Sequence, residues 1–341
     1  MYLDHNATSP MPQAVQDAVF SAMSHAWANP GSPHALGQAS AAQVQRSRQT
    51  IAEALGVPPK QVFFTSGATE GNAWVLSQKA MPVVASATEH PSVLDWSSEV
   101  IAVNESGLID LQALEARLKS GPALVSVMAA NNETGVMQPI EAVYDICQRH
   151  DAPFHCDATQ VFGRIGTPVC ADYITVSAHK FGGPRGVGAL ITSQPPSGIL
   201  KGGKQERGHR AGTLNVPGIV GFAAALSAGQ QWTSDERDKL EAFCKDAGGK
   251  IIGERADRLP NTLSVLFSHP GDLIIAALDL HGVYASTGSA CSSGSSQTSH
   301  VLSEMGIDGT PVRFSFGPGS TAQPAIQALT TVLSQLEGAC V

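Results

Sequence analysis

The sequence predicts an α/β protein with a mostly parallel sheet, followed by a smaller α+β unit. Two observations lead to this prediction. Short apolar runs alternate with segments of helical periodicity as far as residue 191, and buried strands separated by helices are typical of parallel sheets. After residue 240 strand-like and helix-like segments follow one another in a shorter unit.

The elements follow from the spacing of apolar residues. Two helices come first, over 13–27 and 38–55, and Gly56 ends the second. The strands expected next are 62–64, 82–85, 123–128, 153–156, 173–176 and 187–191. Helices near 216–229 and 235–247 then carry the chain out of the sheet, and 262–267, 273–280, 283–285 and 312–316 form the smaller unit.

Composition excludes several classes of protein. No apolar run reaches the roughly 18 residues of a membrane span, and a net charge of -8 without basic clusters argues against a nucleic-acid partner. The 6 cysteines have irregular spacing and no CxxC pair, which predicts neither a metal site nor a disulfide framework. Because the N-terminus resembles neither a signal nor a transit peptide, we expect a cytoplasmic protein with mostly reduced thiols.

The densest chemistry lies in HCDATQ, which contains Asp157, and in SAHKFGGPRGVG, which contains His179 and Lys180. Asp157 ends one expected strand and Lys180 follows the next, so both belong at the carboxyl edge of the sheet, where α/β proteins bind ligands. A lysine and a buried carboxylate at such a place suit pyridoxal phosphate, in which the lysine holds the cofactor and the carboxylate keeps its ring nitrogen protonated. A surface lysine and an unrelated aspartate are the alternative.

Two further segments add to this site. FFTSGATEGNAW places a turn of small residues between a strand and a helix, where the N–H groups of residues 67–69 could bind a phosphate; a plain turn capped by Ser66 is the alternative. TEHPSV offers His90, whose imidazole could lie against a ring, although a lone histidine is more often structural.

The chain also contains the motifs NNETG, QERGHRAGTLNVPGIVG, STGSACSS and VRFSFG, and all of these motifs occur in one order along the sequence. Together they resemble the cysteine desulfurases, pyridoxal-phosphate enzymes of the class V aminotransferase group, from YLDHNAT to RFSFG near residue 317. The resemblance implies fold type I, with a mostly parallel seven-stranded sheet in a large cofactor-binding domain, 11–240. Residues 1–10 and 241–341 would form the small domain, which carries the catalytic cysteine loop.

The resemblance also implies a role for each matching residue. Lys180 would hold the cofactor, and Asp157 would pair with its ring nitrogen. His90 would stack on the ring and would also act in catalysis, as the candidate base for the Cys291 thiol. The ring hydroxyl would meet Asn132 and Gln160, and the phosphate would be surrounded by Ala68, Thr69, Ser177 and His179. Thr213 would reach the phosphate of the other subunit in a homodimer, and Arg313, together with Asn132, would bind the carboxylate of L-cysteine, which suits the fork of a guanidinium.

Cys291 lies among serines and glycines in STGSACSSGSS, with no large apolar residue to bury it. In the family the corresponding thiol takes sulfur from cysteine as a persulfide, and a flexible serine-glycine loop suits a thiol that must travel. The expected partner is then a sulfur-acceptor protein, such as an iron–sulfur scaffold. Two departures from the family pattern bear on substrate closure or partner docking. Lys204 stands where the family has a small residue before QERG, and no basic residue follows RFSFG.

Three other functions remain as alternatives. A selenocysteine lyase, or a related lyase of this fold, would act on a similar amino acid without passing sulfur on. A non-catalytic paralogue would regulate a sulfur-transfer complex, but the joint presence of Lys180, Asp157, His90, Arg313 and Cys291 argues against it. A simple transaminase has no need of the cysteine loop.

Overall fold

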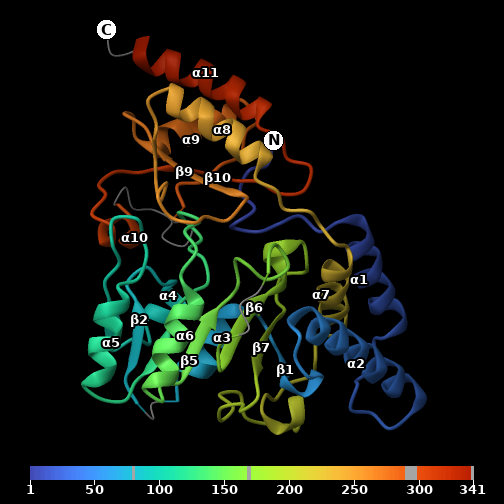
Figure 1. Cartoon of the computed structure of the whole chain (residues 1–341). Helices are drawn as coiled ribbons and strands as arrows, with labels where there is room; N and C mark the ends of the chain where they lie inside the picture. The colour runs from blue at the N-terminus through green and yellow to red at the C-terminus, as the bar shows by residue number, and fades with distance from the viewer. Residues whose placement is uncertain (79–80, 167–169, 289–297, 339–341) are drawn as a thin grey trace.

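The larger part of the molecule is a twisted sheet with helices on both sides, seen in the lower half of the computed structural model in Figure 1. The structure describes residues 1–78, 81–166, 170–288 and 298–338. Within them a 7-stranded sheet has the order β1-β7-β6-β5-β4-β2-β3. Its strands are β1 (Val62–Thr65), β2 (Val83–Ser86), β3 (Glu99–Ile101), β4 (Leu124–Ser126), β5 (Phe154–Asp157), β6 (Tyr173–Ser177) and β7 (Gly188–Thr192).

The predicted mostly parallel sheet is confirmed. The ladders joining β3, β2, β4, β5 and β6 are all parallel. Among the described strands of this sheet, β7 alone runs the other way, antiparallel to both β6 and β1. All four residues of β1, β2 and β5 are buried, which explains their continuous apolar runs.

Helices enclose this sheet. They are α1 (Gln13–His25), α2 (Ala35–Leu55), α3 (Ala68–Leu76), α4 (Pro91–Leu94), α5 (Leu111–Lys119), α6 (Ile140–Arg149) and α7 (Val216–Ser227). α1 and α2 both pack against α7, at the β1 side in Figure 1. Gly56 ends α2 in the left-handed conformation, with φ of 67°, as the sequence predicts.

The smaller unit, orange to red in Figure 1, stands over one edge of the larger sheet. An antiparallel sheet of order β10-β9-β8 lies within its described residues. The elements are α8 (Asp235–Asp246), β8 (Lys250–Ile251), β9 (Thr262–Leu266), α9 (Gly271–Leu280), α10 (His300–Glu304), β10 (Val312–Ser315) and α11 (Gln323–Gly338). The apolar run 283–285 forms no strand; its Tyr284 makes an isolated bridge to Tyr2.

The N-terminal segment joins the smaller unit rather than the larger one. Leu3 is fully buried in a core made otherwise of residues from Leu240 onward, including Phe314 and Leu329. Its main chain exchanges hydrogen bonds with Tyr284 and Ser315. This shared core supports the division into 11–240 and 1–10 with 241–341, which stays a prediction. No helix of the described residues is long and apolar enough to cross a membrane.

Candidate active site

The parallel strands deliver the expected site residues to one edge of the sheet. Asp157 is the last residue of β5, and Lys180 lies in a short 3-10 helix, η2 (Ala178–Phe181), directly after β6. His90 follows β2, and α3 begins just after β1. Because parallel strands end at the same edge, residues separated by more than 100 positions meet there.

A cavity of about 510 Å³ opens at this edge, between the larger sheet and the smaller unit. Residues of both units line it, from Asn6 near the N-terminus to Arg313 on β10. The expected site residues on its wall are Ala68, Thr69, His90, Asn132, Asp157, Gln160, Ser177, His179, Lys180 and Arg313. Thr213 is exposed and does not line this cavity, and Cys291 lies outside the described residues.

Lys180 and Asp157 are held by different kinds of partner. The Lys180 ammonium donates hydrogen bonds to the main-chain oxygens of Asn6 at 2.7 Å and Ala7 at 3.0 Å. The Asp157 carboxylate accepts from the Asn72 side-chain amide at 2.8 Å and from the main-chain N–H of Thr159 at 3.0 Å. Asp157 is 6% exposed, so these donors stabilise a charge that burial alone would disfavour.

His90 caps the N-terminus of α4. Its Nδ1 accepts a hydrogen bond from the main-chain N–H of Ser92 at 3.1 Å and lies 2.8 Å from the Ser92 hydroxyl. Burial lowers the pKa of His90. The charge of Asp157 raises this pKa, and the charge of Lys180 lowers it, so the net shift is downward. The imidazole is therefore neutral at pH 7.

The start of α3 is suited to an anion. Gly67 has a φ of 154°, and an added Cβ there would meet the Ser177 hydroxyl at 3.7 Å, so the turn passes close to the β6 end. Gly67, not Ser66, is the residue preceding the helix, and no side chain caps it, which removes the plain Ser66 cap as an explanation. The N–H groups of a helix N-terminus favour negative charge, so this turn fits a phosphate.

His179 stands beside this turn. Burial lowers its pKa to about 4, and the nearby charges of Lys180 and Arg164 act in the same direction. Its Nδ1 lies 3.2 Å from the Thr8 hydroxyl. A neutral imidazole at this position is able to donate a hydrogen bond to an anion without adding charge.

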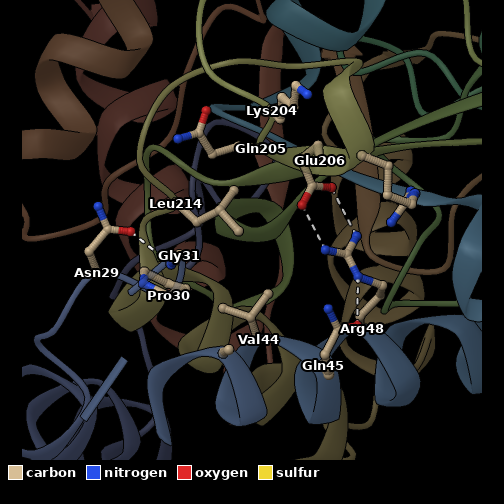
Figure 2. A pocket seen from close by; sticks show the side chains of 12 residues that line it. Asn29, Pro30, Gly31, Val44, Gln45, Arg48, Lys204, Gln205, Glu206 and Leu214 are labelled. Carbon is tan, nitrogen blue, oxygen red and sulfur yellow. Dashed lines mark hydrogen bonds and ion pairs between the residues drawn. The ribbon is translucent and has the colours of Figure 1, made fainter. Parts of the chain in front are cut away.

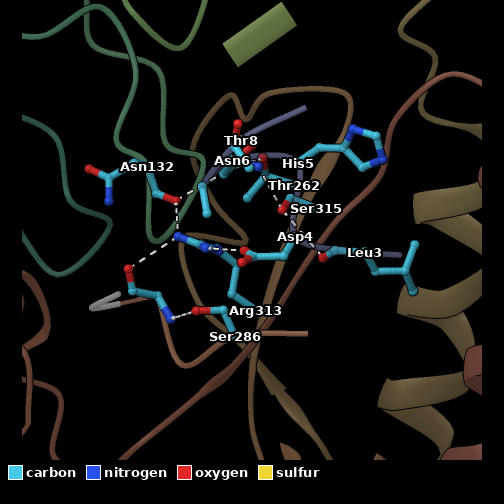
Figure 3. Close-up of polar contacts among 12 residues, drawn as sticks. Leu3, Asp4, His5, Asn6, Thr8, Asn132, Thr262, Ser286, Arg313 and Ser315 are labelled. Atoms are coloured by element: carbon cyan, nitrogen blue, oxygen red, sulfur yellow. Dashed lines mark hydrogen bonds and ion pairs between the residues drawn. The ribbon is translucent and has the colours of Figure 1, made fainter. Parts of the chain in front are cut away.

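Arg313 reaches the cavity from β10, and three of its five N–H groups donate to protein oxygens (Figure 3). Nη1 donates to the main-chain oxygens of Asn132 at 2.9 Å and Gly288 at 3.1 Å, and Nη2 donates to the Asp4 carboxylate at 2.5 Å. Arg313 is 1% exposed, and its Nε has no hydrogen-bond partner among the described residues. A buried donor on the wall of a cavity indicates that a ligand oxygen belongs there.

Two polar residues that the sequence analysis did not single out organise this end of the cavity. Arg164 donates to the main-chain oxygen of Lys180 at 2.6 Å and to the side chains of Asn6 and Gln160, both at 2.8 Å. Burial lowers the pKa of Arg164 to about 9, and the charge of Arg313 adds to the effect. The Asn6 amide in turn donates to the Thr262 hydroxyl at 2.9 Å, which ties the smaller unit to the lysine.

The QERG motif forms a second polar cluster (Figure 2), and its residues do not line this cavity. Arg48 of α2 donates to both carboxylate oxygens of Glu206, at 2.9 and 2.6 Å, and both side chains are buried. Glu206 and Arg207 have positive φ values of 43° and 58°, which non-glycine residues rarely adopt. The buried ion pair therefore holds a strained turn, and the exposed Thr213 follows a few residues later.

Lys204 lines a cavity of about 360 Å³ beside that ion pair and does not line the larger one (Figure 2). Arg210, further along the same segment, forms an ion pair with Glu70 at 2.8 Å. Burial alone would raise the pKa of Glu70, but hydrogen bonds from Arg210 and Ser66 outweigh it and lower the pKa. The ion pair fixes the segment before Thr213 to the first turn of α3.

The class V aminotransferase family model matches residues 1–329. A cysteine desulfurase of Cereibacter sphaeroides is 36% identical, with 98% of this chain and 96% of that protein covered. The chain belongs to the cysteine desulfurase family. A solved structure of a NifS-like protein superposes with a TM-score of 0.90 at 32% identity and covers 99% of both chains. A structure described as SspA in complex with cysteine has a TM-score of 0.84 at 28% identity, covering 93% of this chain and 99% of that one.

This membership confirms the fold type expected from the sequence and implies pyridoxal phosphate. Three observations show that the residues present fit that cofactor. The turn at Gly67 lines the cavity at the uncapped start of α3, Asp157 is a buried carboxylate on the cavity wall, and Lys180 reaches the same cavity. Arg313 then offers its buried Nε to an amino-acid carboxylate.

Four cysteines lie within the residues that the structure describes. Cys147, Cys156, Cys170 and Cys244 are all free thiols within the described residues. Burial raises the pKa of Cys147 and of Cys244 to about 12, and it also raises the pKa of Cys156 and Cys170. Because the thiolate is the nucleophile, these four are poor sulfur carriers. Within the described residues, no cluster of three or more His, Cys, Asp or Glu side chains is able to hold a metal ion.

Proposed function

We propose that the protein is a pyridoxal-phosphate-dependent desulfurase that converts L-cysteine to L-alanine. The Cys291 thiol takes the sulfur: a sulfur–sulfur bond forms, the Cβ–S bond of the substrate breaks, and the proton lost by the thiol balances the proton that alanine gains at Cβ. The products are alanine and a Cys291 persulfide. The buried Nε donor of Arg313, in one cavity with Lys180 and Asp157, is the observation that carries the proposal.

The residues of the cavity divide the work of binding. When bound, pyridoxal phosphate supplies an electron sink next to Cα of the substrate. Lys180 would hold it covalently, and Asp157 would pair with its ring nitrogen. The remaining contacts would come from Ala68, Thr69, Ser177 and His179 at the phosphate, Asn132 and Gln160 at the ring hydroxyl, and His90 at the ring face.

The substrate meets a different set of groups. Arg313 binds the carboxylate through the edge of the guanidinium that carries Nε, and Asn132 lies beside it. The amine of Lys180 moves the proton at Cα, which its position on the cavity wall allows. Asp157 and Arg313 are both buried, so water is excluded from the charged groups that would contact the cofactor and the substrate carboxylate.

The wider setting follows from the same proposal. The exposed Thr213 completes the phosphate site of a second copy, so the active protein is a homodimer. The persulfide passes to a sulfur-acceptor protein such as an iron–sulfur scaffold. The four free thiols suit a reducing compartment such as the cytoplasm.

The test uses the purified chain with pyridoxal phosphate and L-cysteine, and measures alanine and protein-bound sulfur together. We expect both in equal amounts in a single turnover, and neither with Lys180→Ala. The matched control is Lys119→Ala, at the exposed end of α5, which should react like the wild type. Alanine without protein-bound sulfur, or a reaction confined to L-selenocysteine, would instead indicate a lyase.

A further inference from the structure

A continuous row of hydrogen bonds joins Asp157 and His90, the residues expected at the ring nitrogen and at the ring face of the cofactor. Asn72 of α3 donates through Nδ2 to the Asp157 carboxylate at 2.8 Å and to the Ser92 hydroxyl at 3.0 Å. Ser92 then contacts Nδ1 of His90, at 2.8 Å from its hydroxyl and 3.1 Å from its main-chain nitrogen. Asn72 is completely buried, so solvent does not compete for these contacts.

Each member of this row can take only one orientation. A carboxylate is acceptor-only, so the Asn72 amide must turn its NH2 group toward Asp157. That NH2 group also faces Ser92, whose hydroxyl oxygen therefore accepts and whose hydrogen is directed to His90. The other side of the Asn72 amide, Oδ1, is buried and has no partner within the described residues, so no competing contact favours the flipped amide.

The direction of the row fixes the histidine tautomer. The main-chain N–H of Ser92 is a donor in every protonation state, so Nδ1 of His90 must be the acceptor. In a neutral imidazole the ring proton then resides on Nε2. Protonation at Nδ1 would set two N–H groups against each other, in addition to the cost of charging a buried ring.

We propose that Asn72 and Ser92 are positioning residues that lock His90 as a neutral Nε2–H donor, so that His90 serves the reaction by donating a hydrogen bond rather than as a general base. The chemical consequence of this assignment depends on the proposed function. A neutral Nε2–H group stabilises negative charge that develops on the substrate as its Cβ–S bond breaks. The base that activates the thiol is then a group other than His90.

The charged and titratable groups around the ring agree with a neutral donor. Asp157 and Asp95 favour a protonated ring, whereas Lys180 and His300 oppose it. Burial is the largest influence and lowers the pKa. The carboxylate of Asp157 is linked to the ring through Asn72 and Ser92, and this link orients the row.

The first experiment measures the tautomer directly, without cofactor or substrate. Long-range proton–nitrogen NMR of the full chain with labelled histidine separates protonated from unprotonated ring nitrogens, and the signal lost in His90→Gln assigns the residue. We expect an Nε2-protonated neutral ring across neutral pH. Ser92→Ala should raise the pKa of His90, because a hydrogen bond to the neutral form is lost. A proton on Nδ1, or a charged ring at pH 7, overturns the proposal.

Matched variants separate positioning from a general loss of structure. Ser92→Thr keeps both donors and should restore the wild-type spectrum. Ser97→Ala removes a hydroxyl that bonds the Val93 main chain in the same segment and should leave the His90 signal unchanged. A Ser92→Ala spectrum identical to the wild type, in a chain that folds normally, would show that Ser92 does not position the ring.

The second experiment asks what His90 does in the reaction. Glutamine carries an N–H donor but is no base, whereas glutamate is a base without a donor when ionised. Alanine formation by His90→Gln should therefore exceed that of His90→Ala by about tenfold or more, and His90→Glu should not. The reverse order identifies a general base and overturns the proposal. If the wild type forms no alanine, the proposed function fails while the NMR result still stands on its own.

Discussion

Replacing Arg313 by lysine keeps a positive charge at the substrate site but removes the planar fork. The wild-type guanidinium makes three hydrogen bonds, to the main-chain oxygens of Asn132 and Gly288 and to Asp4, and still has Nε to offer (Figure 3). A lysine ammonium has three donors in all, and Asp4 with the two carbonyls would occupy them. No donor would remain for the substrate carboxylate.

The expected size follows from the bond that is lost. A hydrogen bond to a charged group contributes about 1.5–3 kcal/mol, which corresponds to a rise of about 10- to 150-fold in KM for L-cysteine. The turnover number should change much less, because the carboxylate contact exists before and during the reaction. The assay is alanine formation at varied L-cysteine concentration, together with a thermal melt to establish that the variant folds.

Arg117→Lys is the matched control. Arg117 also forms a two-bond ion pair, with Glu99 at 2.6 and 3.0 Å, but it lies on α5, away from the cavity. Its substitution should leave KM unchanged. An unchanged KM in a folded Arg313→Lys chain would refute the reasoning and place the carboxylate on another residue.

The remaining predictions concern the cofactor, the thiol and the fold. Borohydride should trap pyridoxal phosphate on the peptide that contains Lys180, and mass spectrometry that finds it on another lysine contradicts the assignment. Asp157→Asn should retain the cofactor, seen by absorbance, but lose most alanine formation because the electron sink is weakened; normal activity would remove Asp157 from its role. Cys291→Ala should bind cofactor yet form neither alanine nor persulfide at the wild-type rate, whereas alanine substitutions at the four described cysteines should spare the reaction. Glu206→Gln leaves the charge of Arg48 buried at 3% side-chain exposure and should lower the free energy of unfolding by about 3–5 kcal/mol. Urea denaturation measures that loss, and a change below the error of the method would show that the strained turn does not depend on the pair.

The sequence predicts most of the fold because buried strands and amphipathic helices leave a periodic record. It does not predict β3, since Glu99 and Val100 are exposed and the strand has no apolar run. It also assigns no element to 283–285, where burial of Val283 against the core gives an apolar run without a strand. Exposure of an edge strand and burial of a loop both break the link between apolar pattern and element.

For the site, the sequence by itself supplies the family motifs and the positions of Lys180 and Asp157 at strand ends. Only the tertiary structure decides that Asn72 links Asp157 to Ser92 and that Asp4 holds Arg313, because these contacts join residues 20 to 309 positions apart. Periodicity records which face of an element is buried, whereas a hydrogen bond depends on which two faces meet and at what register. That meeting is set by the packing of α3 against the sheet and of the N-terminal segment against β10, which local sequence does not encode.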